Sequence, residues 1–194
     1  METWPDYLQN LWAGLHGMVA TGPSGEPLGV ADTLARWVDL TRDVNDRGGT
    51  LFFVGNGGSA AIASHMAADA SKNGGLRAMA FNDAALLTAV GNDASFEEIF
   101  ALPLTRHGRR GDLLTTISSS GNSPDVVRAL EAARQIDMHI VTLSAKSAQN
   151  RSRTLGDLNF YVPADRYGWI ESAHQVLIHY WFDQYLNRYG QGAL

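Results

Sequence analysis

Short apolar runs alternate with amphipathic stretches through most of the chain. The apolar runs are rich in branched and aromatic side chains and cover residues 51–54, 77–81, 113–117, 139–143 and 158–162. Stretches with apolar residues at helical spacing lie between or after them, at residues 59–72, 124–135 and 169–187. Buried strands that alternate with helices are typical of a parallel sheet covered on both faces. The pattern therefore predicts an α/β fold with a doubly wound, five-stranded parallel sheet.

Two amphipathic helices are predicted before the first of these strands. Residues 3–20 place apolar side chains on one helical stripe, and the glycine- and proline-rich segment 22–27 ends it. A second stripe, from Leu34 to Val44, ends before Gly48 and Gly49. We therefore divide the chain into N-terminal helices, residues 1–48, and a sheet domain, residues 49–190. The aromatic stripes are expected to pack on this domain or on a partner subunit.

Composition narrows the classes of function. The chain has 194 residues, 45% hydrophobic and 18% charged, which is typical of one globular domain. A net charge of -5 argues against a nucleic-acid partner. The absence of cysteine excludes disulfides, thiolate metal ligands and cysteine nucleophiles. We find no secretion signal and no apolar run of about 18 residues, so we expect a cytoplasmic protein with no membrane partner.

The first candidate loop, Gly55-Asn56-Gly57-Gly58-Ser59, joins an apolar strand to a helix. Ligands bind at the carboxyl ends of strands in such sheets, and glycines let backbone N–H groups approach them closely. Ser59 is placed to cap the helix that follows. The glycine spacing matches neither a dinucleotide-binding fingerprint nor a Walker A motif. An ordinary tight turn is the alternative interpretation.

The second candidate loop contains four serines, Ser118, Ser119, Ser120 and Ser123. It also joins a strand to a helix, with Pro124 in the first turn of that helix. Serine hydroxyls and free N–H groups at a helix N-terminus form an anion site, so a phosphate fits there without a lysine or arginine. A flexible polar loop is the alternative. The turn lacks the GxSxG pattern, so no serine nucleophile is indicated.

Histidines and carboxylates on two helices are candidates for acid-base or metal chemistry. His65 and Asp69 are four residues apart and share a helix face, so they can bind one metal or share a proton. Glu171 and His179 lie eight residues apart on the last helix, and at ~1.5 Å per residue their Cα atoms are about 12 Å apart. One ion shared by all four within a subunit is therefore awkward, unless different subunits contribute.

A basic stretch, residues 106–110, contains three arginines and one histidine just before a strand. We interpret it as a solvated loop, with a subunit contact or an arginine reaching a neighbouring phosphate as the alternatives.

The two loops, GNGGS and ISSSGNS, resemble the sugar isomerase (SIS) domain family and, within it, the phosphoheptose isomerases. The likeness covers residues 30–188 and includes Val90-Gly91-Asn92-Asp93 and the last helix with Glu171, His174 and His179. The resemblance implies a flavodoxin-like sheet and N-terminal helices that assemble a homotetramer, with active sites near the subunit interfaces. It also implies that the four serines hold a sugar phosphate and that the sugar contacts Asn56, Gly57, Gly58, Ser59, Asn92 and Asp93.

The resemblance further implies a zinc ion in each subunit. In the similar enzymes the zinc and catalytic positions match His65, Asp69, Glu171 and His179. Asp69 departs from the usual Glu and is one methylene shorter, which puts rate or substrate choice in doubt. Glu171 departs from the usual Gln, and its added charge favours a bound divalent ion. Asp69 and Glu171 are also expected to contact the substrate.

The function implied is the interconversion of sedoheptulose 7-phosphate and D-glycero-D-manno-heptose 7-phosphate through an enediol, for bacterial heptose and surface polysaccharide synthesis. Asp69 and His179 are the expected catalytic residues, and whether Asp69 acts as base or as metal ligand stays open. Three alternatives remain: a non-catalytic SIS binding protein of the replication-initiation-partner type, a phosphosugar sensor, or an isomerase of another sugar phosphate.

Overall fold

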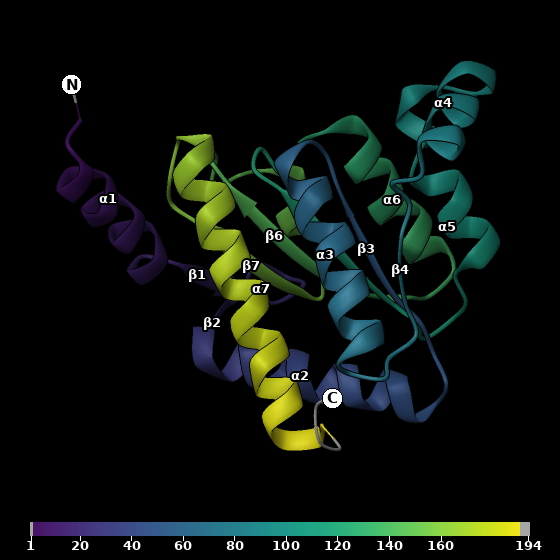
Figure 1. The fold of residues 1–194 in the computed structure, drawn as a ribbon, viewed down its shortest axis with the longest axis horizontal. Helices are drawn as coiled ribbons and strands as arrows, with labels where there is room; N and C mark the ends of the chain where they lie inside the picture. Colours follow the sequence, from purple (N-terminus) through teal and green to yellow (C-terminus); the bar gives the residue numbers. More distant parts are fainter. Residues whose placement is uncertain (1, 191–194) are drawn as a thin grey trace.

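A seven-stranded sheet with helices on both faces forms the body of the molecule (Figure 1). The computed structural model describes residues 2–190, so Met1 of the predicted N-terminal unit lies outside the described residues. The strands are β1 (Val19–Thr21), β2 (Pro27–Leu28), β3 (Leu51–Gly55), β4 (Ala78–Ala80), β5 (Leu113–Ser118), β6 (His139–Ala145) and β7 (Leu158–Val162). The helices are α1 (Trp4–His16), α2 (Val30–Asp46), α3 (Gly58–Lys72), α4 (Ala84–Asp93), α5 (Ala101–His107), α6 (Pro124–Gln135) and α7 (Tyr167–Tyr189), with short 3-10 turns η1 (Phe96–Glu98) and η2 (Arg151–Thr154).

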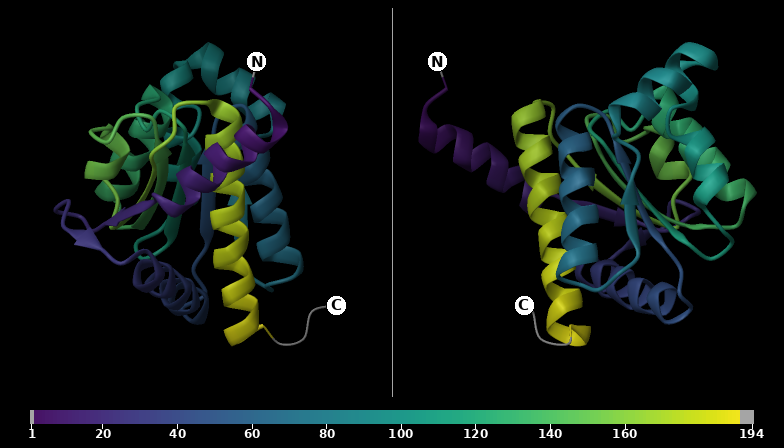
Figure 2. Two further views of the ribbon diagram at one scale, coloured as in Figure 1. Left: turned by 90° about the vertical axis from the view of Figure 1, so that its left-hand side faces the viewer. Right: turned by 45° about the vertical axis from the view of Figure 1, so that its right-hand side comes forward.

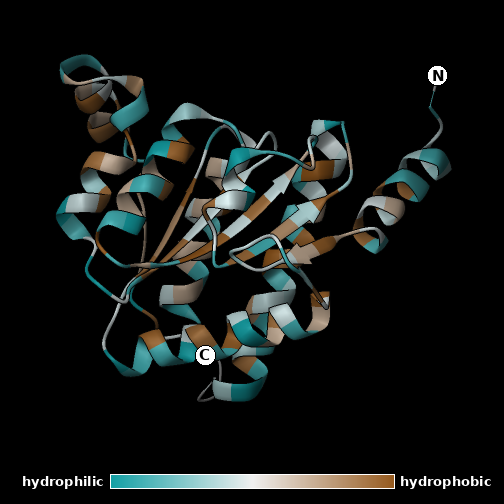
Figure 3. Cartoon of the chain, turned by 180° about the vertical axis from the view of Figure 1, so that it is seen from behind, coloured by the Kyte–Doolittle hydropathy of each residue, from teal (hydrophilic) through white to brown (hydrophobic). Residues whose placement is uncertain are grey.

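Five strands form a parallel sheet in the order β4-β3-β5-β6-β7, as the sequence predicts. Numbered along the chain, this is the 2-1-3-4-5 order of flavodoxin-like folds. Successive residues of a strand face opposite sides, so Phe53 packs in the core under α2, α3 and α7, and Phe52 packs in the core under α5 and α6. Figure 3 shows the apolar strands enclosed by helices with one apolar and one polar side. Trp37 of α2 stacks on Trp181 of α7, with ring centroids 4.5 Å apart.

The predicted first helix is shorter than the apolar stripe that suggested it. It ends at His16 with Gly17 as its C-terminal cap, and residues 19–21 form β1 instead. β1 pairs antiparallel with β7, and β2 pairs antiparallel with β1, so the sheet is mixed and has seven strands. The edge of β7 explains the difference, because its open backbone groups gain partners and Ala20 and Thr21 become buried.

Helix α1 extends away from the rest of the molecule (Figure 2). Its inner side, Leu11 and Leu15, packs on a small apolar cluster that includes Val162 and Ile170. Its outer side carries Trp4 and Trp12, which are 69% and 66% exposed. The predicted aromatic stripe therefore divides between a face that contacts the body and a face open to solvent. None of the helices within residues 2–190 combines the length and apolarity needed to cross a membrane.

Candidate active site

The glycine and serine loops meet at one edge of the sheet, where β3 and β5 end. After β3 the chain crosses to β4 on one side and then returns to β5 on the other side. Such a reversal leaves a crevice at the carboxyl ends of the two strands, and it is where open α/β sheets bind ligands. A cavity of about 120 Å³ lies here, lined by Asn56, Ser59, Ile117, Ser118, Ser119, Ser120, Ser123, Tyr167 and Glu171. The structure thus brings all four serines together with Asn56, Ser59 and Glu171.

The serine loop is held firmly from behind. Gly121 has φ of +62°, and its N–H donates to the carbonyl oxygen of Ser118 at 3.1 Å. Its carbonyl oxygen accepts both the N–H and the hydroxyl of Ser152, each at 2.9 Å. The hydroxyl of Ser123, the N-cap of α6, makes no cap hydrogen bond to the helix. The Ser123 hydroxyl lies 3.4 Å from the Ser120 hydroxyl instead. The first turn of α6 therefore presents N–H groups without a side-chain cap, beside two serine hydroxyls, which suits an anion.

The glycine loop lies close to its neighbours because it lacks side chains. A Cβ on Gly55 would lie 2.6 Å from the carbonyl oxygen of Ile117, and a Cβ on Gly58 would lie 2.5 Å from Glu171 Oε2. Asn56 Nδ2 donates to Asp125 Oδ2 at 2.7 Å and so ties this loop to α6. The predicted cap is wrong: the N-cap of α3 is Gly57, with φ of 54° and no side-chain cap bond. Ser59 lies inside the helix and faces the pocket instead.

A cluster of His65, Asp69 and His179 lies between α3 and α7. One ligand atom from each residue lies within 4.8 Å of those of the other two. His65 Nε2 lies 3.3 Å from Asp69 Oδ2, and the two imidazole rings are 5.2 Å apart. Two imidazole nitrogens and one carboxylate oxygen are a donor set that suits a catalytic zinc ion with an open coordination position. The residues therefore fit the predicted metal.

Glu171 does not belong to this cluster. It lies against Gly58 at the start of α3, two turns before His65. Seven residues of helix separate these positions by about 10 Å, at ~1.5 Å per residue. Within one chain, the described residues therefore bring three of the four predicted ligands together, as the spacing of Glu171 and His179 in the sequence indicated. Glu171 belongs to the serine pocket.

Known proteins identify the domain that carries this site. Residues 30–145 match the family model for the SIS domain. The chain belongs to the SIS domain family. A phosphoheptose isomerase of Bordetella avium is 39% identical over 77% of this chain and 80% of its own length. A phosphoheptose isomerase of Helicobacter pylori is 34% identical over 78% of this chain and 81% of its own length.

Solved structures agree with the SIS assignment. The phosphoheptose isomerase of Neisseria gonorrhoeae superimposes with a TM-score of 0.75 at 35% identity, covering 79% of this chain and 86% of that chain. The phosphoheptose isomerase of Francisella tularensis superimposes with a TM-score of 0.82 over 94% of this chain and 96% of that chain. The second likeness, at 24% identity, shows the fold alone.

Two predicted sugar contacts of the SIS domain lie away from the pocket. Asn92 and Asp93 end α4, are exposed, and bond to each other, with Asn92 Nδ2 2.8 Å from Asp93 Oδ1. Figure 1 shows α4 at the far side of the molecule from α7. Neither residue lines the serine pocket within the described chain.

The structure adds Ile117 and Tyr167 to the pocket and assigns His174 to the core. Tyr167 lines the serine pocket, four residues before Glu171 on the same face of α7. No motif marks it, and only its helical spacing from Glu171 carries a signal. His174 is fully buried, and burial lowers its pKa to about 4. Its neutral ring faces the carbonyl oxygen of Ser144 at 3.3 Å through Nε2, so it supports β6 from behind the site.

Proposed function

We propose that this SIS protein is a phosphoheptose isomerase that interconverts sedoheptulose 7-phosphate and D-glycero-D-manno-heptose 7-phosphate. The observation that carries the proposal is the arrangement of α3. This helix begins at an anion pocket and carries His65 and Asp69 two turns farther on. An extended sugar phosphate needs that arrangement, because its phosphate and its carbonyl are at opposite ends. The identity to phosphoheptose isomerases, 39% and 34%, supports the same reaction.

In this proposal the phosphate group occupies the serine pocket. The hydroxyls of Ser119, Ser120 and Ser123 and the N-terminus of α6 receive it. Glu171 repels a phosphate, so we assign it to the sugar hydroxyls next to Gly58. Asn92 and Asp93 are exposed and lie outside this pocket, so we propose that they contact the sugar of a neighbouring subunit in an assembled oligomer.

Proton transfer is assigned to Asp69 and His179. The reaction moves a proton between C1 and C2 through an enediol while the hydroxyl and carbonyl oxygens exchange roles. Asp69 removes the carbon-bound proton and His179 serves the oxygens, or the two residues exchange these roles. Both lie on the partly exposed surface between α3 and α7, where substrate reaches them.

A metal ion fits this arrangement. His65, Asp69 and His179 would hold a zinc ion, which when bound polarises the carbonyl and stabilises enediolate charge. A carboxylate bound to a cation is a weaker base, so the role of Asp69 as base and its role as ligand compete. Zinc content and turnover of the same variant distinguish the two roles.

The deciding experiment is turnover of sedoheptulose 7-phosphate by chelated protein, with and without added Zn²⁺. We expect metal-dependent aldose formation and a loss of about 10²–10⁴-fold in Asp69→Asn. Asp69→Asn that keeps its zinc identifies Asp69 as the base, and Asp69→Asn that loses its zinc identifies it as a ligand. Asp43→Asn, at an exposed position of α2, is the matched control and should keep full activity.

Absence of turnover in protein that still binds the sugar phosphate would overturn the proposal. The protein would then be a non-catalytic SIS binding protein, or an isomerase of another substrate if a different sugar phosphate is turned over. A panel of hexose and pentose phosphates in the same assay separates these two cases.

We also propose a homotetramer with active sites beside its interfaces. Exposed Trp4 and Trp12 on α1 support an interface, as do exposed Val176 and Tyr180 on the turn of α7 that carries His179. Light scattering of the wild type and of Trp12→Ser tests this assembly, which a monomeric wild type would contradict. We propose a cytoplasmic location, because the charged phosphate of the substrate keeps that substrate from crossing membranes. The product of the reaction would supply heptose for surface polysaccharides.

A further inference from the structure

A second and larger cavity lies at the opposite edge of the sheet, with a volume of about 540 Å³. Its walls are the segments that enter β3, β4 and β5, together with the ends of α2 and α5. The serine pocket lies where β3 and β5 end. β5 has six residues, so the two cavities are separated by roughly 20 Å at ~3.3 Å per residue. The volume is that of sites for small molecules, about 300–1,000 Å³.

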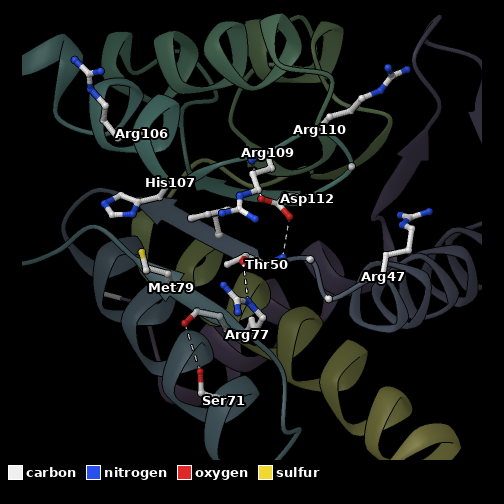
Figure 4. A pocket seen from close by; sticks show the side chains of 15 residues that line it. Arg47, Thr50, Ser71, Arg77, Met79, Arg106, His107, Arg109, Arg110 and Asp112 are labelled. Atoms are coloured by element: carbon white, nitrogen blue, oxygen red, sulfur yellow. Dashed lines mark hydrogen bonds between the residues drawn. The ribbon is translucent and has the colours of Figure 1, made fainter.

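Positive charge gathers in this cavity although the chain is acidic overall. Its lining includes five arginines from three separate segments: Arg47, Arg77, and Arg106, Arg109 and Arg110 of the stretch 106–110. Figure 4 shows Arg77 and Arg109 directed toward the middle of the cavity and the other three at its rim. The two inner guanidinium groups therefore face the same space from opposite walls.

The acidic residue in the lining does not neutralise these arginines. Asp112 is 4% exposed, and its two carboxylate oxygens accept the N–H groups of Thr50 and Arg109, each at 2.8 Å. Within residues 2–190, neither Arg77 nor Arg109 forms an ion pair, and Arg110 has only a 3.8 Å contact with exposed Asp137. Unpaired guanidinium groups around a concave surface attract an anion.

Hydrogen bonds order the backbone and side chains beneath the two inner arginines, Arg77 and Arg109. Asp112 joins the start of β5 to the start of β3 through its bond to Thr50. Arg77 Nε donates to Thr50 Oγ1 at 3.4 Å, so it leans on the same residue. Because these residues are already ordered without a ligand, less conformational entropy is lost when a ligand binds.

We propose that this cavity is a second ligand site, distinct from the proposed active site, that binds a small molecule carrying a diphosphate group. Arg77 and Arg109 bind the two phosphates, since each guanidinium makes paired hydrogen bonds to phosphate oxygens. The rim arginines draw the anion in. The concave shape and the net charge of -5 favour a small molecule over a nucleic acid.

The test is calorimetric titration with ADP, AMP and inorganic pyrophosphate. We expect saturable binding of one ADP per chain, and AMP binding at least about tenfold weaker because one phosphate is missing. Arg77→Gln and Arg109→Gln should each weaken ADP binding at least about tenfold. Arg36→Gln removes the same charge from an exposed position of α2 outside the cavity, and it should change binding less than twofold.

Three results would overturn the inference. Equal weakening by Arg36→Gln would mean that only net charge matters. Equal affinity for ADP and AMP would exclude recognition of a diphosphate. Loss of ADP binding in Ser120→Asp, which adds a negative charge to the serine pocket, would place the ligand there instead. Thermal unfolding of each variant within a few degrees of wild type establishes that the fold is intact, and the outcome is independent of isomerase activity.

Discussion

Gly121→Ala tests whether the serine loop is as firmly held as its contacts indicate. The residue has φ of +62°, a conformation that costs a side chain about 1–2 kcal/mol. The new methyl would also collide with the side-chain amide of Asn150. That amide is fully buried and cannot move freely, because it bonds to Ser144 Oγ at 3.0 Å, to the Ser147 carbonyl at 2.8 Å and to the Arg153 N–H at 3.3 Å.

Displacing Asn150 would break these three hydrogen bonds, each worth about 1 kcal/mol. The total cost of Gly121→Ala is therefore about 4 kcal/mol, and at ~2–4 °C per kcal/mol the melting temperature should fall by roughly 8–16 °C. Loop displacement should also raise the KM for the sugar phosphate at least about tenfold.

Gly75→Ala is the matched control. Gly75 has φ of +63°, yet a Cβ there meets nothing within 4 Å, so it isolates the backbone cost of about 1–2 kcal/mol. Differential scanning calorimetry and steady-state kinetics on both variants decide the matter. Equal melting temperatures for the two variants, with an unchanged KM in Gly121→Ala, would refute the account of the loop.

Three further predictions concern charge, pH and side-chain length. Glu171→Gln removes a negative charge from the pocket proposed for phosphate and should lower the KM about tenfold in the isomerase assay; an unchanged KM would show that Glu171 does not sense the phosphate. Burial lowers the folded-state pKa of His174 to about 4, so the unfolded chain binds the extra proton and stability is lost as pH falls from about 6.5 to 4, by up to about 3 kcal/mol. His174→Gln should remove this contribution to the pH dependence of the unfolding free energy, as measured by urea unfolding at pH 7 and pH 4.5. Asp69→Glu lengthens this side chain by one methylene and should raise the turnover rate, and a rate below that of wild type would mean that the position of α3 already suits Asp.

The sheet was predictable from the spacing of apolar residues along the chain. The site loops were predictable from their position directly after two of the apolar strands. Apolar runs such as Leu51–Val54 predict buried strands, and the carboxyl ends of neighbouring parallel strands meet at one edge. The serine and glycine loops therefore had to share a pocket once β3 and β5 were neighbours. The four-residue spacing of His65 and Asp69 predicted that they share one helix face, and the structure confirms that they lie together.

Contacts that depend on packing between remote segments were not predictable. β1 has three residues, and its strand conformation exists because β7 offers it an open edge. The same holds for the arginine-lined cavity. The stretch 106–110 is visible in the sequence, but Arg47 and Arg77 join it only through the arrangement of α2 and β4.

The serine pocket lies at the start of α3 and His65 lies two turns farther along the same helix. This arrangement restricts how the length of the accepted substrate can change between related proteins. An α-helix advances by whole residues and turns about 100° with each one, so inserting or deleting one residue between Gly58 and His65 would swing the imidazole away from α7. The span from phosphate to reacting carbons therefore cannot be adjusted in small steps by changing this helix. A change in the length of the substrate would instead require a shift of the loops or a side chain of different length, and Asp69, whose carboxylate is one methylene nearer the backbone than that of a Glu, is a position where the second route is open.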